Sequence, residues 1–569
     1  MDVVLVTDEL LGYTRTGGIG TATTFLALGL GRLGHRVQVL YGATPPDAPL
    51  EDEWARLYDG VGVSIRLLPR SGEAVEPPHF GRMRDVERAL AADPPDVVVT
   101  QDLAAPAYTA IRLRSLGLGF PDTRFVVYCH GTRQWITDTA RKVRVLPGAL
   151  AITRLEQLSI ELADEVVSPS AYVETWMRGQ GWRLPEESRV IPYLTRAVAT
   201  GEPQKRTDAA AAPVRRIAFF GRLEERKGIT PFVAALNRLP RELLHGVEVD
   251  FVGRATEAWR PERIAALLSG TPAQLSFATD LDQPQALARL AQPGTLAVMP
   301  SFAETYGNTV RECLDYAIPF IASNAGAIPE LIAPEDRARV LFEPTPSGIA
   351  GALRRILAVD DTFLPARPAF DPADALTAWS ELVAARATAP RAATRTTADP
   401  FLLVHDADDE PDADLRETLE RAQAVSGADV VTCGVRVRGD ETETLHFFPG
   451  EPGGLGLLGN GYGTVALVRG SLLDDERPPI WQLLARLSVH GARIVSVPRP
   501  LATTTNPPVT LESDPRAALA VAQELERALP RSLRSLARLA AGLAAEASRR
   551  PAPRRRRLGS LRRVVRRIR

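Results

Sequence analysis

The sequence predicts an α/β protein built from two doubly wound parallel-sheet domains, a smaller α/β unit and a basic helical tail. Apolar segments of strand length alternate with helical segments through residues 1–200, and the alternation restarts after a linker-like stretch at 201–214. These segments are apolar along their whole length, which is typical of parallel strands covered by helices on both faces. A chain of 569 residues is also too long for one core, so we expect two to four domains.

The first domain is predicted at residues 1–200. Its first strand is followed by a glycine-rich turn, TRTGGIGT at 14–21, and then by a helix over 21–34. Further apolar runs that end in polar residues or glycine predict strands. The strands expected in this domain lie at 2–7, 36–42, 96–101, 124–131 and 163–170.

The second domain is predicted at residues 201–390. Its expected strands, separated by helices, lie at 215–221, 247–253, 275–279, 296–301 and 319–323. Two doubly wound domains joined by a linker imply a cleft between the carboxyl ends of their strands, where ligands bind in such sheets. We therefore expect the functional site in that cleft.

The third unit is predicted at residues 399–510, and a helical, arginine-rich tail at 514–569. The chain has a net charge of −1, but residues 549–569 contain 11 arginines and no acid, so the rest carries −12. An acidic body with a strongly basic tail indicates an anionic surface as the partner of the tail.

The tail also has an amphipathic pattern. Leucine, valine and isoleucine recur at helical spacing in 558–568, and arginine occupies most of the opposite face. A basic amphipathic helix of this kind is typical of binding to an anionic membrane surface. A solvated, disordered tail is the alternative. Nucleic acid is not expected as a partner, because the tail lacks interleaved aromatic residues and the body is acidic.

The cellular compartment is predicted from what the sequence lacks. The three cysteines show no metal-ligand spacing, and so few do not form a disulfide framework. The first residues have no basic segment before an apolar core, and no run of 18 apolar residues occurs. We expect a cytoplasmic protein, with its tail at the inner face of the membrane.

Lysine is rare in this chain. Only Lys142, Lys205 and Lys227 are present, whereas 65 residues are arginine. Lys227 lies in FGRLEERKGI (220–229), directly after a predicted strand, five residues beyond Arg222. This position indicates a need for a compact ammonium group. Chance is the alternative, because Lys205 is equally rare and lies in the linker.

Two carboxylates, Glu304 and Glu312, lie on either side of a predicted turn. Glu304 is expected in a loop after a strand and Glu312 on the following helix, with Gly307 and Asn308 at the helix N-terminus. Free amides at such an end can face an anion, and the carboxylates can accept hydrogen bonds from a polyol. The alternative is a pair of solvated acids at a helix end.

The segment that contains these residues, PSFAETYGNTVRECLDYAIPFIASNAGAIPELI (300–332), resembles the retaining glycosyltransferases of family 4. That family has two Rossmann-like domains that face a cleft, the GT-B fold. Its Glu-x7-Glu motif is matched by Glu304 and Glu312, and GAIPELI closes the segment as in the family. One departure is Ala317, where the family usually has glycine; packing is expected to tolerate the change.

The resemblance extends over about residues 1–385, in the family's order. The other matching segments are TGGIGT (16–21), FVVYCHG (125–131), ADEVVSPSAYV (163–173) and GRLEERKG (221–228). It implies a nucleotide-sugar donor as substrate. The residues implied as catalytic are His130, Arg222, Lys227 and Glu304, and those implied as donor-binding are Gly17, Gly18, Arg222, Lys227, Arg254, Glu304, Gly307, Asn308, Thr309 and Glu312.

The chemistry of transfer explains these residue types. Charge develops on the diphosphate as it leaves, and fixed cations aimed at it lower the barrier. Arg222 can grip two oxygens, Lys227 supplies a point charge, and Gly18 allows close backbone approach. By resemblance, Glu304 would hold the sugar hydroxyls and Glu312 the ribose, and His130 would contact the sugar. His130 alone could equally be a histidine satisfied in the core. Since GT-B enzymes generally act without a divalent metal, no cofactor is expected.

The third unit resembles the middle and acceptor half of family 2 glycosyltransferases, which have the GT-A fold. FLLVHDADDEPDAD (401–414) would place an Asp-x-Asp metal motif at Asp406 and Asp408. The strands and helices that should precede this motif and hold the nucleotide are replaced by linker. We therefore expect a degenerate, non-catalytic unit, with an active second centre or a merely solvated acidic loop as alternatives.

Together these features predict a retaining, metal-independent glycosyltransferase. It would move a hexose-type sugar from a nucleoside diphosphate to a glycan, lipid-linked or small-molecule acceptor. The rival hypothesis is a non-catalytic sugar- or nucleotide-binding partner in a glycosylation assembly, because the third unit is degraded. The enzyme is favoured because all five residues of the expected site are intact: His130, Arg222, Lys227, Glu304 and Glu312.

Overall fold

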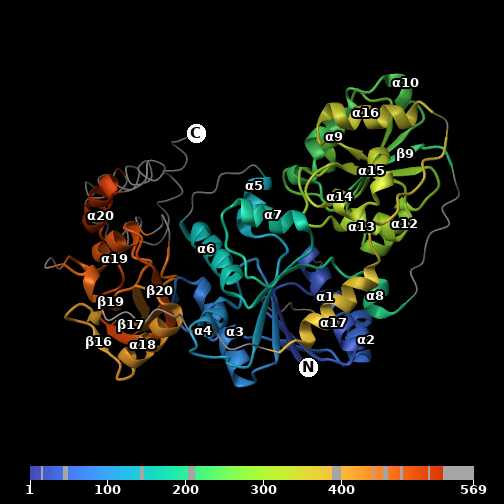
Figure 1. The fold of residues 1–569 in the computed structure, drawn as a ribbon. Helices are drawn as coiled ribbons and strands as arrows, with labels where there is room; N and C mark the ends of the chain where they lie inside the picture. Colours follow the sequence, from blue (N-terminus) through green and yellow to red (C-terminus); the bar gives the residue numbers. More distant parts are fainter. Residues whose placement is uncertain are drawn as a thin grey trace.

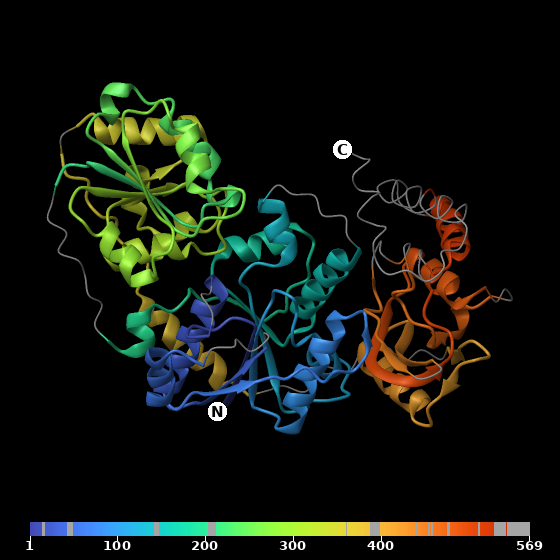
Figure 2. The ribbon, with the colours of Figure 1, turned by 180° about the vertical axis from the view of Figure 1, so that it is seen from behind.

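The computed structural model shows three bodies in a row, with the first domain in the middle (Figures 1 and 2). The residues that the structure describes are 1–13, 17–42, 49–140, 147–202, 212–359, 361–386, 399–439, 442–452, 456, 459–474, 478–509, 513–528 and 542.

The first domain contains a seven-stranded parallel sheet. Its strand order is β3 (Ser64–Leu67), β2 (Arg36–Tyr41), β1 (Asp2–Thr7), β5 (Val97–Gln101), β6 (Arg124–Tyr128), β7 (Glu165–Ser168) and β8 (Ser188–Val190). In the central strand, Val3 and Leu5 pack into one hydrophobic cluster and Val4 and Val6 into another. Both faces are thus covered, which is why the apolar pattern of this strand is continuous.

Helices cover both faces of this sheet. They are α1 (Gly18–Arg32), α2 (Asp52–Gly60), α3 (His79–Ala92), α4 (Tyr108–Ser115), α5 (Arg133–Thr139), α6 (Pro147–Leu162), α7 (Ala171–Gly179) and α8 (Arg196–Thr200). Helix α1 packs against α8, whereas α4 packs against α3 and α6.

The second domain repeats the plan with six parallel strands. Their order is β11 (Gln274–Ala278), β10 (Glu248–Val252), β9 (Arg216–Phe220), β12 (Thr295–Met299), β13 (Phe320–Ser323) and β14 (Leu341–Phe342). Its helices are α9 (Ile229–Leu236), α10 (Arg241–Leu244), α11 (Pro261–Leu267), α12 (Gln283–Leu290), α13 (Asn308–Asp315), α14 (Ile328–Leu331), α15 (Pro334–Val340) and α16 (Pro346–Leu357). Two parallel-sheet domains of this kind confirm the predicted fold class.

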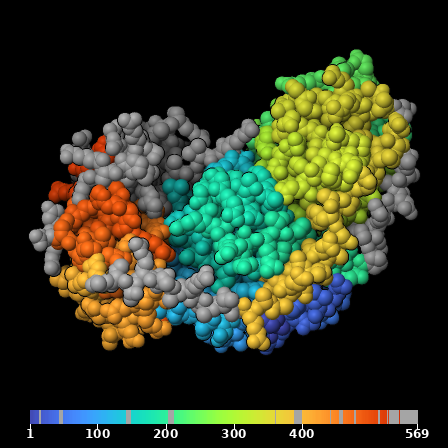
Figure 3. Space-filling view, in the orientation of Figure 1, coloured from blue at the N-terminus to red at the C-terminus, as the bar shows by residue number. Residues whose placement is uncertain are grey.

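The chain then returns to the first domain. Helix α17 (Pro372–Ala384) packs against α1, and the ring centroids of Trp379 and Tyr128 lie 4.9 Å apart. Gly29 makes room for this helix, because a Cβ there would lie 2.9 Å from Leu376 Cδ1. Figure 3 shows the segment crossing from the second domain onto the first. The predicted second-domain range, 201–390, therefore includes a helix that packs on the first domain.

The third unit is a mixed sheet. Antiparallel pairs join β15 (Phe401–Val404) to β19 (Ala466–Arg469), β19 to β17 (Val430–Arg438), and β17 to β18 (Glu443–His446). On its other edge β17 pairs in parallel with β20 (Ile494–Thr504), which also pairs with β16 (Glu410–Pro411). Its helices are α18 (Leu415–Ser426) and α19 (Ile480–Val489). The likeness of this unit to family 2 stays a prediction.

The third unit packs directly against the first domain and shares a sheet with it. A strand of the first domain, β4 (Val75–Glu76), extends its sheet by pairing with β18. Leu445 N donates to Ala74 O at 2.9 Å, and Phe447 N donates to Glu76 O at 2.9 Å. The Phe447 ring stacks on Phe80 of α3, with centroids 5.6 Å apart. The sheet and the core of the third unit are therefore continuous with the first domain.

The tail begins with α20 (Pro515–Ala528). The amphipathic helix predicted at 549–569 lies outside the described residues. Within the described part of the chain, no helix is both long and apolar enough to span a membrane.

Candidate active site

Glu304 lies in the loop between β12 and α13, at the carboxyl edge of the second sheet. Its Oε1 is 2.6 Å from Lys227 Nζ, and its Oε2 is 3.4 Å from Arg226 Nη1. Lys227 ends the short 3-10 turn Glu225–Lys227 that follows β9. Because β9 and β12 are neighbours in the sheet, the loops after them meet, and two residues far apart in the sequence become paired.

The Glu304 carboxylate is ionised at neutral pH. Burial would raise its pKa, but the charges of Lys227 and Arg226 outweigh burial and hold the pKa at about 2. Burial lowers the pKa of the Lys227 ammonium, and Glu304 opposes that shift. An ionised, largely buried carboxylate is a strong acceptor for hydroxyl hydrogen bonds.

Gly228 explains why the turn can lie so close to the Glu304 loop. Its φ of +80° is in the left-handed region, and a Cβ there would lie 1.9 Å from Pro300 O. Any other residue would push the two loops apart. The Lys-Gly pair therefore places the ammonium against the carboxylate.

His130 follows β6 of the first domain and is buried. Its Nδ1 lies 2.7 Å from the Tyr193 hydroxyl, and its Nε2 has no hydrogen-bond partner among the described residues. Burial lowers the pKa of His130 to about 3, so the ring is neutral at physiological pH. His130 is thus suited to hydrogen bonding rather than to supplying charge, and Nε2 is the atom that a substrate could engage.

The main chain around His130 is held from both domains. Asp102 Oδ1 accepts a bond from His130 N, and Asp102 Oδ2 accepts one from Gly131 N, each at 3.0 Å. From the second domain, Thr305 Oγ1 donates to His130 O at 2.9 Å. The residue after Glu304 therefore contacts His130 directly, which brings two predicted site residues from different domains together.

The glycine-rich loop, like His130, belongs to the first domain. Helix α1 starts at Gly18, where a Cβ would lie 3.3 Å from Asn308 Nδ2 of the second domain. Gly17 N and Gly20 N donate to Glu9 Oε2 at 3.2 and 3.4 Å. Gly17, which is predicted to bind the donor, thus already donates its amide to an anion, the Glu9 carboxylate.

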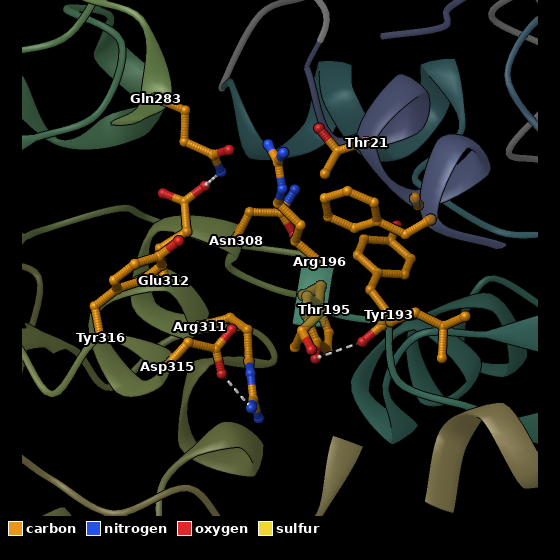
Figure 4. A pocket seen from close by; sticks show the side chains of 14 residues that line it. Thr21, Tyr193, Thr195, Arg196, Gln283, Asn308, Arg311, Glu312, Asp315 and Tyr316 are labelled. Atoms are coloured by element: carbon orange, nitrogen blue, oxygen red, sulfur yellow. Dashed lines mark hydrogen bonds and ion pairs between the residues drawn. The ribbon is translucent and has the colours of Figure 1, made fainter. Parts of the chain in front are cut away.

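Glu312 lines a crevice between the domains (Figure 4). Gln283 and Glu312 lie on one side and Thr21 and Tyr193 on the other. Gln283 Nε2 donates a hydrogen bond to Glu312 Oε1, and burial raises the pKa of Glu312 to about 7.

Helix α13 carries the other predicted residues on this side. Gly307 is its N-cap, with φ +100°, and Asn308 and Thr309 are half-buried in its first turn. The left-handed φ of Gly307 favours glycine at this position.

Two predicted donor-binding cations are exposed. Arg222 Nη1 lies 3.7 Å from Glu224 Oε2, and its side chain is 51% exposed. Arg254 is also exposed, and its carbonyl accepts a bond from Leu223 N at 2.9 Å. Neither side chain is part of the Lys227–Glu304 pair.

Asp406 and Asp408 are exposed in the third unit, on the side of the first domain away from the second (Figure 1). The described residues contain no group of three or more histidine, cysteine or acidic side chains arranged to hold a metal ion.

The structure shows a different reason for glycine at position 317 in the family. Ala317 has φ +53° and follows α13, where Ile318 N donates to Cys313 O at 2.9 Å. This is the arrangement of a helix C-terminus that favours glycine. The positive φ of Ala317 therefore explains why glycine suits this position.

Several residues that contact the candidate site residues were not predicted from the sequence. Arg226 lies inside the GRLEERKG segment but was not distinguished from its neighbours, and Tyr193 and Asp102 lie outside the short motifs on which the predicted resemblance was based. These three residues are recognised only by their contacts in the folded protein. Arg226 contacts Glu304, and Tyr193 and Asp102 contact His130.

This geometry defines a class of protein. Two Rossmann-like domains that contribute an ionised carboxylate, clustered cations and a glycine-rich helix start to one interdomain site form a GT-B glycosyltransferase.

Sequence comparison gives the family. Residues 16–193 match the family described as Glycosyltransferase Family 4, and residues 214–359 match Glycosyl transferases group 1. Together the two matches cover more than half of the chain, and the protein belongs to the family 4 glycosyltransferases, which have the GT-B fold.

Individual relatives are distant. The sulfoquinovosyl transferase SQD2 of Arabidopsis thaliana is 28% identical over 150 residues, which is 26% of this chain and only 25% of that protein. A glycogen synthase of Mycobacterium tuberculosis is 25% identical over 425 residues, covering 68% of this chain and 93% of that protein.

Solved structures similar to this chain include sucrose-phosphate synthase from Thermosynechococcus elongatus, with a TM-score of 0.48 and 18% identity over 67% of this chain and 96% of that one. Anabaena HepE, in complex with UDP and glucose, has a TM-score of 0.46 and 15% identity over 68% of this chain and 99% of that one.

Proposed function

We propose that the protein is a retaining glycosyltransferase that moves a hexose-type sugar from a nucleoside diphosphate to a glycan, lipid-linked or small-molecule acceptor. One observation carries this proposal: the Lys227–Glu304 pair, 2.6 Å long, whose loop also contacts the main chain of His130 across the cleft. The relatives named as a sulfoquinovosyl transferase and a glycogen synthase support a sugar as the transferred group.

Each site residue has its own role in the proposed transfer. The bond between the sugar and the diphosphate breaks, and its electron pair leaves with the phosphate oxygen. Lys227 and Arg222 stabilise the charge that develops there, without a divalent metal. Glu304 accepts hydrogen bonds from the sugar hydroxyls, and His130 contacts the sugar through Nε2, which has no hydrogen-bond partner among the residues that the structure describes. The acceptor hydroxyl bonds to the anomeric carbon, and its proton passes to the departing phosphate.

A panel of UDP-, GDP-, ADP- and dTDP-sugars tests this function. We expect one nucleotide to raise the melting temperature and its sugar to be transferred or hydrolysed. Glu304→Ala and Lys227→Ala should abolish turnover while each variant stays folded. Undiminished turnover in both variants would reject the site. Thermal stabilisation without turnover by the unmodified protein would instead support a binding protein.

We also propose that the arginine-rich tail binds an anionic membrane surface. Its 11 arginines would each contribute on the order of 1 kcal/mol near such a surface. Co-sedimentation with phosphatidylglycerol vesicles, compared with phosphatidylcholine vesicles and with a chain ending at residue 548, measures this. Equal binding of both chains would contradict it.

We propose that the third unit is non-catalytic. The exposed positions of Asp406 and Asp408, with Asp408 Oδ2 accepting a bond from Asn506 Nδ2 at 3.2 Å, support a structural role for this loop. Asp406→Asn with Asp408→Asn should leave the transfer rate unchanged. A large loss of transfer would show a second active centre.

A further inference from the structure

Two segments that matched the family have no role in the site described above: ADEVVSPSAYV (163–173) and GAIPELI (326–332). In the structure they meet across the domain boundary. Glu330, on α14 of the second domain, accepts main-chain hydrogen bonds from Ala171 N through Oε2 and from Tyr172 N through Oε1, each 2.8 Å long. Ala171 and Tyr172 are the first two residues of α7 in the first domain.

The Glu330 carboxylate is a suitable acceptor for the N-terminus of α7. The first N–H groups of a helix have no partner within the helix, and the helix dipole favours a negative charge there. Both oxygens of Glu330 are used, which fixes the direction of the carboxylate as well as its distance. The second domain therefore supplies a cap for a helix of the first.

Ser170, the N-cap residue of α7, makes a second link. Its hydroxyl donates to Thr305 O at 2.7 Å, and both residues are buried. Thr305 Oγ1 in turn donates to His130 O at 2.9 Å. The residue that follows Glu304 is thus held by the first domain through its carbonyl and through its hydroxyl.

Within the second domain, the Glu330 turn and the Glu304 loop behave as one unit. Ala327 N donates to Glu304 O at 2.9 Å. Gly326 has φ +60°, and a Cβ there would lie 2.5 Å from Glu304 O. Because the two segments are packed this closely, a force that positions Glu330 also positions Glu304.

We propose that Glu330 and Ser170 form an interdomain latch that holds the two domains closed with Glu304 aligned on His130. These bonds exist only while the domains are in contact, so each favours the closed state over the open one. Glu330 and Ser170 are positioning residues, since they act through Thr305 and Glu304 rather than on the substrate. The consequence for catalysis rests on the proposed function, whereas the effect on closure does not.

Spin-label distances test the latch on the unliganded full chain. The natural cysteines Cys129, Cys313 and Cys433 are buried, so labels can be directed to Arg183→Cys in the first domain and Arg355→Cys in the second, both exposed. Glu330→Gln keeps the shape of the side chain but replaces one acceptor oxygen with an amino group. Glu335→Gln is the matched control, because Glu335 is an exposed acid of the same domain, 3.5 Å from the exposed Arg367.

With Glu330→Gln and with Ser170→Ala we expect longer and broader distances, and with Glu335→Gln the distances of the unmodified protein. Unchanged distances in both latch variants would overturn the proposal, whether or not transfer is detected. Because Ser170 also caps α7, Glu330→Gln decides the result if Ser170→Ala does not fold.

The kinetic readout separates positioning from folding. With the donor that the protein turns over, Glu330→Gln should lower kcat about tenfold, a change of about 1.4 kcal/mol, with little change in the donor KM. Longer distances with an unchanged kcat would overturn the positioning role. If the unmodified protein turns over no nucleotide sugar, the proposed function fails, and the distance measurement still decides the latch.

Discussion

Lys227 Nζ lies 2.6 Å from Glu304 Oε1, so the group predicted to bind the diphosphate is paired with the group predicted to bind the sugar. Arg226 lies on the other carboxylate oxygen at 3.4 Å, and Glu224 lies 3.1 Å from Arg226. These four charged side chains lie close together, and Lys227 is the one whose positive charge is carried by a small ammonium group. Arg226 is thus already a guanidinium beside the same carboxylate.

We therefore expect Lys227→Arg to lower kcat/KM for the donor about 100-fold, as loss of one oriented charge-stabilising group does. The planar fork would have to fit where a point charge now lies, beside Arg226. Steady-state kinetics measure this, and an unchanged melting temperature shows that folding is intact. Arg238→Lys on the surface of the same domain, where the side chain donates a hydrogen bond to the exposed Ser347, is the control. Near-normal activity would mean that lysine at this position is an accident.

Donor affinity should depend on the protonation of Glu312. Burial raises its pKa to about 7, so the carboxylate is mostly ionised above pH 7 and mostly protonated below it. If the carboxylate accepts the ribose hydroxyls, the donor KM should rise about tenfold from pH 8 to pH 6, which follows the ionised fraction of a group with that pKa. In Glu312→Gln this dependence should be flat. A variant that keeps the full pH dependence would assign it to another group.

Ala317→Gly should stabilise the second domain by about 1 kcal/mol, because glycine adopts a positive φ without the steric cost that alanine has. Ala317 has φ +53°. Thermal or urea unfolding of the full chain measures the change. Ala358→Gly is the control, since Ala358 also ends a helix but has φ −73°, where glycine brings no relief. Equal effects of the two substitutions would contradict this explanation.

Phe447→Ala should destabilise the first and third units together, by about 3–5 kcal/mol, as loss of a buried aromatic side chain does. Phe447 stacks on Phe80, and Arg84 lies 4.8 Å from the centre of its ring. Leu402→Ala, at a site that is 48% exposed in the same unit, should have little effect.

A chain that ends at residue 386 should lose solubility for the same reason, because it exposes the apolar surface of α3 and α4 and leaves β4 without its partner. A soluble, fully active truncated chain would show that the third unit is dispensable to the first domain.

Most strands of both doubly wound domains could be predicted closely from the sequence, but the edge strands β3, β8 and β14 were not predicted. The apolar run at 2–7 coincides with β1, and the run at 296–301 overlaps β12. A parallel strand buried on both faces leaves an unbroken apolar signal, and the helices around it supply the contrast. The site residues Glu304 and Lys227 could be predicted because they lie in segments whose order and spacing match a known family.

The sequence alone thus determined most strands of the two sheets and indicated a cleft between them, whereas the chemical roles of the groups that face the cleft stay predictions. Only the tertiary structure decided that α17 returns to the first domain, that β4 completes the sheet of the third unit, and that Glu330 caps α7. Each of these contacts joins residues far apart in the chain, and each is made by groups that are unremarkable locally: a helix face, an edge strand and a single carboxylate. A local sequence pattern shows which surfaces must be buried or hydrogen-bonded. Which other segment buries or bonds them depends on how whole domains pack.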